Sequence, residues 1–173
     1  MTDVPRFDTA PGARPHAFDP VPRPECFEGV LSRRVIAFLI DMAMLVVAMT
    51  AIVLFIALFG LVTLGLGWLL FFLVGPIFVV LAIVYFGSTL ASPASATLGM
   101  RAMDLEMRLW YGTPMYFLLG AVHVIVFWIS VSVFTPLILV VGLFNARKRL
   151  LHDLICGTVV VNNEARAARL RRS

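Results

Sequence analysis

We predict an all-α integral membrane protein, and three observations support this fold class. The 173-residue chain is 61% hydrophobic and only 14% charged, a balance typical of membrane proteins rather than of soluble domains. Its apolar runs are long enough to cross a bilayer, for which about 20 residues suffice as helix. All lysines and arginines lie outside these runs, where they orient a membrane protein. We therefore expect a lipid bilayer as partner and no nucleic acid, despite the formal charge of +4.

The chain divides into three parts by composition. Residues 1–30 hold six of the ten prolines among scattered charges, and such a segment cannot bury enough apolar surface to offset the cost of ordering. We expect a disordered Pro-rich tail there, and no cleaved signal peptide, because an early apolar region is missing. Residues 31–161 are predicted to form one membrane domain, and residues 162–173 a basic C-terminal tail.

The first predicted span carries a charged side chain. From Val35 to Phe59 every residue is apolar or small except Asp41, and Arg33 and Arg34 precede the run. A carboxylate at the centre of a membrane helix costs about 2.5 to 3.5 kcal/mol on insertion scales, so it is expected to face protein or water. Asp41 is therefore the first candidate functional residue.

A second span follows a glycine-rich turn. It covers Trp68 to Phe86, and Gly75-Pro76 near its middle predicts a kink because proline removes a backbone hydrogen bond. Residues 87–114 are polar and return to water. Within them, apolar residues alternate with charged ones up to Leu109, which predicts a short strand after Asp104.

The third apolar stretch, Met115 to Phe144, is too long for one upright crossing. As a straight helix it would measure about 45 Å, against about 30 Å of hydrocarbon. Pro136, preceded by hydroxyl residues, predicts a bend within it. We expect a re-entrant or tilted hairpin, and the alternative is one third transmembrane helix.

The distribution of basic residues favours the hairpin. Five precede the first span, two lie in residues 87–114 and seven follow Phe144. Three plain crossings would leave seven basic residues on each side, whereas an even number of crossings places all fourteen on the cytoplasmic side. We therefore predict a multi-pass protein whose termini are both cytoplasmic.

The segment after the third stretch begins with Arg147, Lys148 and Arg149. Apolar residues recur after them at helical spacing and Gly157 follows, a pattern typical of a short basic amphipathic helix at the membrane surface that ends at the glycine. Cations in this place are expected, but an acid weakens their attraction to headgroups. Asp153 is therefore the second candidate functional residue.

The sequence does not indicate an enzyme, a cofactor or a metal site. Cys26 and Cys156 form no metal-binding pattern, and none of the common hydrolase or nucleotide-binding motifs is present. His152-Asp153 is similar to a phosphohydrolase metal pair, but such a site needs further ligands. Of the other histidines, His16 lies in the tail and His123 lies in the third apolar stretch. His123 is a secondary candidate, which we expect to be a hydrogen-bonded, packed side chain rather than a proton carrier.

Three blocks in order carry a family resemblance: Arg33-Arg34 with Ala37 and Ile40-Asp41, then Thr97-Leu98-Gly99-Met100-Arg101, then His152-Asp153 with Gly157-Thr158-Val159-Val160-Val161. The chain resembles the RDD family of small bacterial membrane proteins, named for one arginine and two aspartates. The resemblance implies that Arg34, or Arg33, is the arginine and that Asp41 and Asp153 are the aspartates. It also implies the bacterial inner membrane and a link to transport.

Spacing limits how these residues meet. Arg34 and Asp41 share a helix face but lie about 10.5 Å apart along the axis, too far for a direct bond. Another segment must supply the partner of Asp41, and Asp153 could meet Arg34 or Arg33. The available donors for Asp41 are Arg101, Arg149 and His152. We expect one polar cluster on the cytoplasmic side.

Two functions fit such a cluster. In the first, Asp41 and Asp153 exchange a monovalent cation or proton while Arg34 tunes their pKa. Because three apolar segments cannot enclose a pathway alone, transport would need a homo-oligomer or another membrane protein. In the second, the cluster is a structural clasp in a membrane accessory or assembly factor. The sequence names no substrate.

Overall fold

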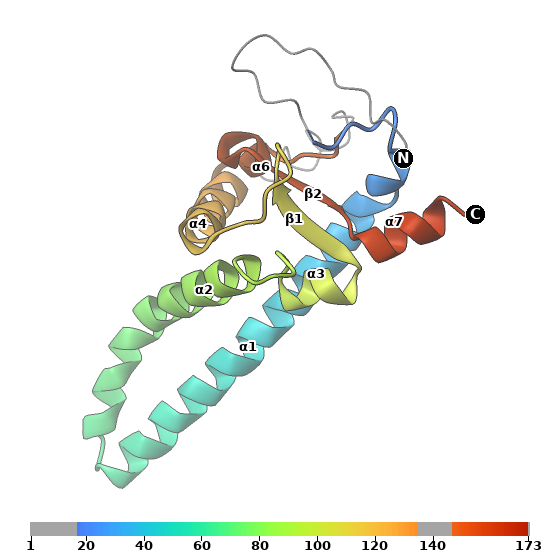
Figure 1. Ribbon diagram of the computed structural model, residues 1–173. Helices are drawn as coiled ribbons and strands as arrows, with labels where there is room; N and C mark the ends of the chain where they lie inside the picture. Colours follow the sequence, from blue (N-terminus) through green and yellow to red (C-terminus); the bar gives the residue numbers. More distant parts are fainter. Residues whose placement is uncertain (1–16, 135–146, 173) are drawn as a thin grey trace.

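The computed structural model describes residues 17–134 and 147–172 (Figure 1). The elements in chain order are η1 (Pro24–Cys26), α1 (Val30–Val62), η2 (Leu66–Leu73), α2 (Val74–Leu90), α3 (Leu98–Ala102), β1 (Leu105–Leu109), α4 (Phe117–Phe134), α6 (Leu151–Cys156), β2 (Thr158–Asn162) and α7 (Glu164–Leu170). Helices α1 and α2 form a long hairpin. The short elements gather around the first half of α1 and the end of α2, far from the hairpin's turn (Figure 1).

The hairpin agrees with the two predicted spans. Two helical segments, Pro24–Val62 and Leu66–Leu90, are long and apolar enough to cross a membrane. Only 17% and 6% of their apolar windows are buried inside the protein, so neither resembles the core helix of a soluble domain. Large apolar side chains such as Val46 and Val47 point outward and are more than half exposed. A bilayer is the environment that such surfaces require.

The predicted kink coincides with a change of helix type. The eight residues of η2 form a 3₁₀-helix, and the α-helix α2 begins at Val74, directly before Gly75 and Pro76. Proline fits in the first turn of an α-helix because the N–H it lacks would have no intrahelical partner there. Pro76 therefore marks where the second span becomes α-helical.

A two-stranded antiparallel sheet makes the fold mostly helical rather than all-α. The predicted strand is confirmed as β1, which pairs with β2 in a register from Leu105 opposite Asn162 to Leu109 opposite Thr158. We did not predict β2. All five of its residues are buried, so its sequence shows no alternation of apolar and polar residues, and alternation is the signal from which a strand is read.

Part of the segment for which we expected disorder is packed. Residues 1–16 lie outside the described residues, but Cys26 and Phe27 are buried against Val159 and Val161 of β2. The side chain of Asn162 donates hydrogen bonds to two backbone carbonyls of this segment, at 2.8 and 3.0 Å. The expectation fails for residues 17–30 because a few apolar side chains pack against a hydrophobic surface, which the average composition of the segment does not indicate.

The expected basic tail also contains structure. Helix α7 begins after Asn163, whose side chain accepts a hydrogen bond from the Arg166 N–H at 3.0 Å, a usual N-terminal cap. Ala167 is buried. The C-terminal segment is therefore anchored to the short elements and continues the membrane domain.

Helix α4 is the described part of the third apolar stretch. Its 18 residues give about 27 Å of helix, and it packs against α2 and α6. Glycines allow the close approach to α2, since a Cβ on Gly120 would lie 3.2 Å from the Gly87 Cα. Residues 135–146, with Pro136, lie outside the described residues. Whether the third apolar stretch forms a re-entrant or tilted hairpin or crosses once therefore stays a prediction.

Candidate functional site

The arginine before the first span pairs with the second aspartate. Arg34 lies near the start of α1, and its Nη1 and Nη2 donate to the two carboxylate oxygens of Asp153 at 2.5 and 3.0 Å. The side chain of Asp153 is fully buried and that of Arg34 is 12% exposed. Asp153 Oδ2 also accepts from the Leu150 N–H at 2.9 Å. This bidentate pair, which we call the clasp, holds α6 against α1.

Burial and neighbouring charges shift the pKa values of Asp153 and His152 in α6. Burial alone would raise the pKa of the Asp153 carboxyl, but the charge and hydrogen bonds of Arg34, together with His152 and His123, hold that pKa well below its usual range. Burial lowers the pKa of His152 to about 4. At neutral pH the clasp is therefore an ionised aspartate and an arginine beside an uncharged histidine.

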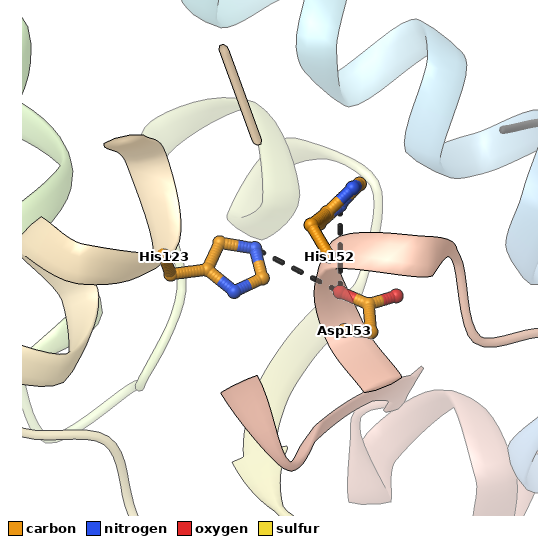
Figure 2. Close-up of side chains that lie close together, drawn as sticks. All are labelled: His123, His152 and Asp153. Atoms are coloured by element: carbon orange, nitrogen blue, oxygen red, sulfur yellow. Dashed lines mark ion pairs between the residues drawn. The ribbon is translucent and has the colours of Figure 1, made fainter. Parts of the chain in front are cut away.

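A histidine from α4 completes this group, as Figure 2 shows. His123 Nε2 lies 3.7 Å from Asp153 Oδ1, and His152 Nε2 lies 3.5 Å from the same oxygen. The two rings meet edge to face with centroids 5.0 Å apart. Sequence reasoning set His123 apart as packing within an apolar stretch. One signal in the sequence could have indicated its role: a histidine within an apolar stretch is poorly solvated, so it requires a polar partner.

This group has the composition of a metal site, but its centre already holds a cation. Ligand atoms of His123, His152 and Asp153 lie within 4.8 Å of one another, and these residue types bind zinc. Arg34 Nη2, however, lies 3.0 Å from Asp153 Oδ1 and 3.5 Å from His152 Nε2. A metal ion would have to displace the guanidinium, so we interpret the group as an arginine-centred cluster.

Asp41 lies in a different environment. Its buried carboxylate accepts hydrogen bonds from the Tyr85 hydroxyl at 2.6 Å, the Thr97 hydroxyl at 2.6 Å and the Gly99 N–H at 2.8 Å. Thr97 caps α3 by accepting from the Met100 N–H. Gly99 is required, since a Cβ there would lie 2.0 Å from the backbone oxygen of α1 at position 37. All three donors are neutral.

The single cluster that we expected is two clusters in the structure. The expected cationic partners bind oxygens elsewhere: Arg33 donates to the Met103 carbonyl, Arg101 to the Ala96 carbonyl and the Ser92 hydroxyl, and Arg149 to the carbonyls of Thr158 and Asp153. His152 lies with the clasp. Asp41 makes no ion pair within residues 17–134 and 147–172. The reason is that α3 begins beside Asp41, so the Thr97 hydroxyl and the Gly99 N–H bind its carboxylate in place of a cation.

Both clusters border one cavity of about 420 Å³. The polar side chains that line it are Arg34, Asp41, Thr97, His123 and His152, and the other lining residues that the structure describes are apolar. It lies among α1, α2, α4 and the short elements, and its volume is within the usual range for small-molecule pockets. The two aspartate-containing clusters are thus linked through a shared space.

A long apolar hairpin with a buried arginine–aspartate clasp at one end defines a helical membrane protein with an internal polar site. The chain belongs to the RDD family, whose model matches residues 29–157. The matched region contains Arg34, Asp41 and Asp153, as the resemblance in sequence indicated. Comparisons with curated proteins and with solved structures gave no match.

Proposed function

We propose that the protein takes part in cation transport across the bacterial inner membrane, with Asp41 as the group that binds the cation. The observation that carries this proposal is a buried carboxylate in an apolar membrane helix, beside a cavity, with only neutral hydrogen-bond donors. Ionisable groups in such segments are costly, and they mark ion and substrate pathways. A bound cation or proton would neutralise the charge.

The clasp has a structural part in this proposal. Asp153 is saturated by Arg34 and the Leu150 N–H, so it does not share in cation exchange as the sequence-based hypothesis had it. The clasp holds α6, and with it the wall of the cavity at His152. Removing one partner of a buried pair strands the other charge, so both residues are needed for the cavity to keep its shape.

The orientation that we propose places both termini and residues 87–114 in the cytoplasm. It is supported by the absence of basic residues from 60–73, the turn between α1 and α2. All fourteen basic residues lie before α1, in the first turns of α1 or after α2. The described ones lie at the end of the hairpin where the short elements gather (Figure 1). Since two long helices and α4 do not enclose a pathway, the transporting unit is a homo-oligomer or includes another membrane protein.

Flux measurements in everted vesicles test the proposal. Vesicles from cells that express the full chain are given Na⁺, K⁺ or an organic cation. At least one of these cations should cause proton movement above the level of vector-only vesicles, and Asp41→Asn should abolish it. The matched control is Asp104→Asn, because Asp104 is partly exposed and pairs with Arg169 outside the cavity. Full flux in the Asp41→Asn variant would refute the role of Asp41.

The second candidate is an accessory or assembly factor, and the clasp is the observation that favours it. A buried, bidentate pair stabilises an arrangement of helices without any transported ion. This candidate requires that the wild-type protein moves no cation while Arg34 and Asp153 still determine its stability. In neither candidate do we propose an enzyme activity, because the His–His–Asp group found among the described residues is occupied by Arg34.

A further inference from the structure

The cavity beside Asp41 does not suit an inorganic cation. Among the lining side chains that the structure describes, only Asp41 and Thr97 carry oxygen atoms, whereas hard cations gather about six oxygen ligands. Those oxygens are already engaged with each other and with Tyr85 and Gly99. A volume of about 420 Å³ also far exceeds what a bare ion fills. The size and lining of the cavity therefore point to a larger and mostly apolar ligand.

Aromatic residues line the cavity that borders Asp41. Phe38, Phe86 and Phe127 line the cavity, and the rings of Phe38 and Phe127 have centroids 5.5 Å apart. Phe38 lies three residues before Asp41, on the same face of α1. Aromatic faces attract quaternary ammonium groups, which need no hydrogen-bond acceptors. The lining thus offers a carboxylate and aromatic rings, the two features that an organic cation needs.

The charges around the cavity give the ligand its sign. Arg34 is neutralised by Asp153, and the buried His152 is uncharged at neutral pH. The carboxylate of Asp41 is left without a cationic partner among the described residues. A positively charged ligand is therefore favoured over a neutral or anionic ligand of the same shape.

The cavity also meets the surface that faces the bilayer. Three of its lining residues, Val35, Phe38 and Leu39, are 45%, 36% and 59% exposed on the outside of α1. A ligand that partitions into the membrane would reach the cavity from this side without crossing a polar barrier. A small, strongly hydrated ion would not take that route.

We propose that the cavity binds a lipophilic organic cation, namely a quaternary ammonium or phosphonium ion that carries apolar groups. The carboxylate of Asp41 balances its charge, the three phenylalanine rings contact the cationic centre, and the apolar lining covers its substituents. This inference rests on the proposed function and narrows its cation to one chemical class.

Equilibrium dialysis with tetraphenylphosphonium tests the inference, using the full chain in phosphatidylcholine nanodiscs. Tetraphenylborate, of the same shape and opposite charge, is the matched probe. We expect saturable binding of tetraphenylphosphonium alone, weakened about tenfold or more by Asp41→Asn. Uptake of each ion by protein-free nanodiscs is subtracted, because the two ions partition into a bilayer to different extents. Equal remaining uptake of both ions, or tetraphenylphosphonium uptake unchanged in the variant, would overturn the inference.

A second pair of variants tests the rings without touching the charge. Phe38→Leu should weaken binding of tetraphenylphosphonium several-fold, whereas Phe55→Leu, at a position 64% exposed on the same helix, should leave it unchanged. Both changes are conservative at exposed positions, so they remain informative if Asp41→Asn fails to fold. An equal effect of the two variants would contradict a site at the cavity.

The flux assay separates this inference from the proposed function. If Asp41→Asn abolishes movement of inorganic cations and the wild type does not bind tetraphenylphosphonium, the organic-cation class is wrong and transport stands. If binding depends on Asp41 while no flux of any cation is found, the binding site stands and transport is removed.

Discussion

The clasp predicts a large and non-additive loss of stability. Asp153→Asn keeps the shape of the side chain and its acceptor for the Leu150 N–H, but it leaves the charge of Arg34 in a site where the side chain is only 12% exposed. Breaking a buried pair by removing one partner costs about 3–5 kcal/mol. For a chain of this length each kcal/mol lowers the melting temperature by about 2–4 °C, so we expect a decrease of about 6–20 °C.

A double-mutant cycle separates the clasp from general damage. The free energy of unfolding, or the melting temperature in one detergent, is measured for Asp153→Asn, Arg34→Met and the two together. The double variant should lose at least about 2 kcal/mol less than the sum of the single variants, because it strands no charge. The exposed pair Arg169 and Asp104 is the matched control, with single losses of about 1 kcal/mol or less. Additive losses at Arg34 and Asp153 would refute the clasp.

Three further predictions follow from other parts of the structure. The pKa of His152 is about 4 in the folded protein and about 6.5 when unfolded, so between these pH values the unfolded chain binds more protons than the folded chain. The melting temperature should therefore fall as pH is lowered from 6.5 to 5. His152→Gln should reduce the dependence of the free energy of unfolding on pH by up to about 1.4 kcal/mol per pH unit. Gly99→Ala should destabilise by about 1–3 kcal/mol through overpacking, since a Cβ would lie 2.0 Å from the Ala37 oxygen, whereas Gly75→Ala, with nothing within 4 Å, should be neutral in the same melting assay. Reporter fusions at both chain ends should be active only in the cytoplasm, and a C-terminal fusion active only in the periplasm, with the N-terminus inside, would restore three plain spans.

Sequence reasoning succeeded where the signal was local. The alternation up to Leu109 predicted β1, and the glycine at 157, which adopts a left-handed φ of 64°, marked the end of α6. It failed where a segment's role depends on a distant surface. Strand β2 has no alternation because it is covered on both sides, and residues 17–30 are ordered because Phe27 finds β2.

What the sequence by itself determined is the class of the protein: two apolar membrane spans, basic residues outside the apolar runs, and an arginine and two aspartates as candidates. These are properties of length and hydropathy along the chain, and they hold whatever the helices pack against. Only the tertiary structure decided the partners. Asp153 could have met Arg33 or Arg34, and packing of α6 on α1 selected Arg34. Asp41 was expected to meet a cation, but α3 brought Thr97 and Gly99 to it first. A buried polar group takes the nearest donor that the fold supplies, and which donor is nearest depends on contacts between residues far apart in the sequence.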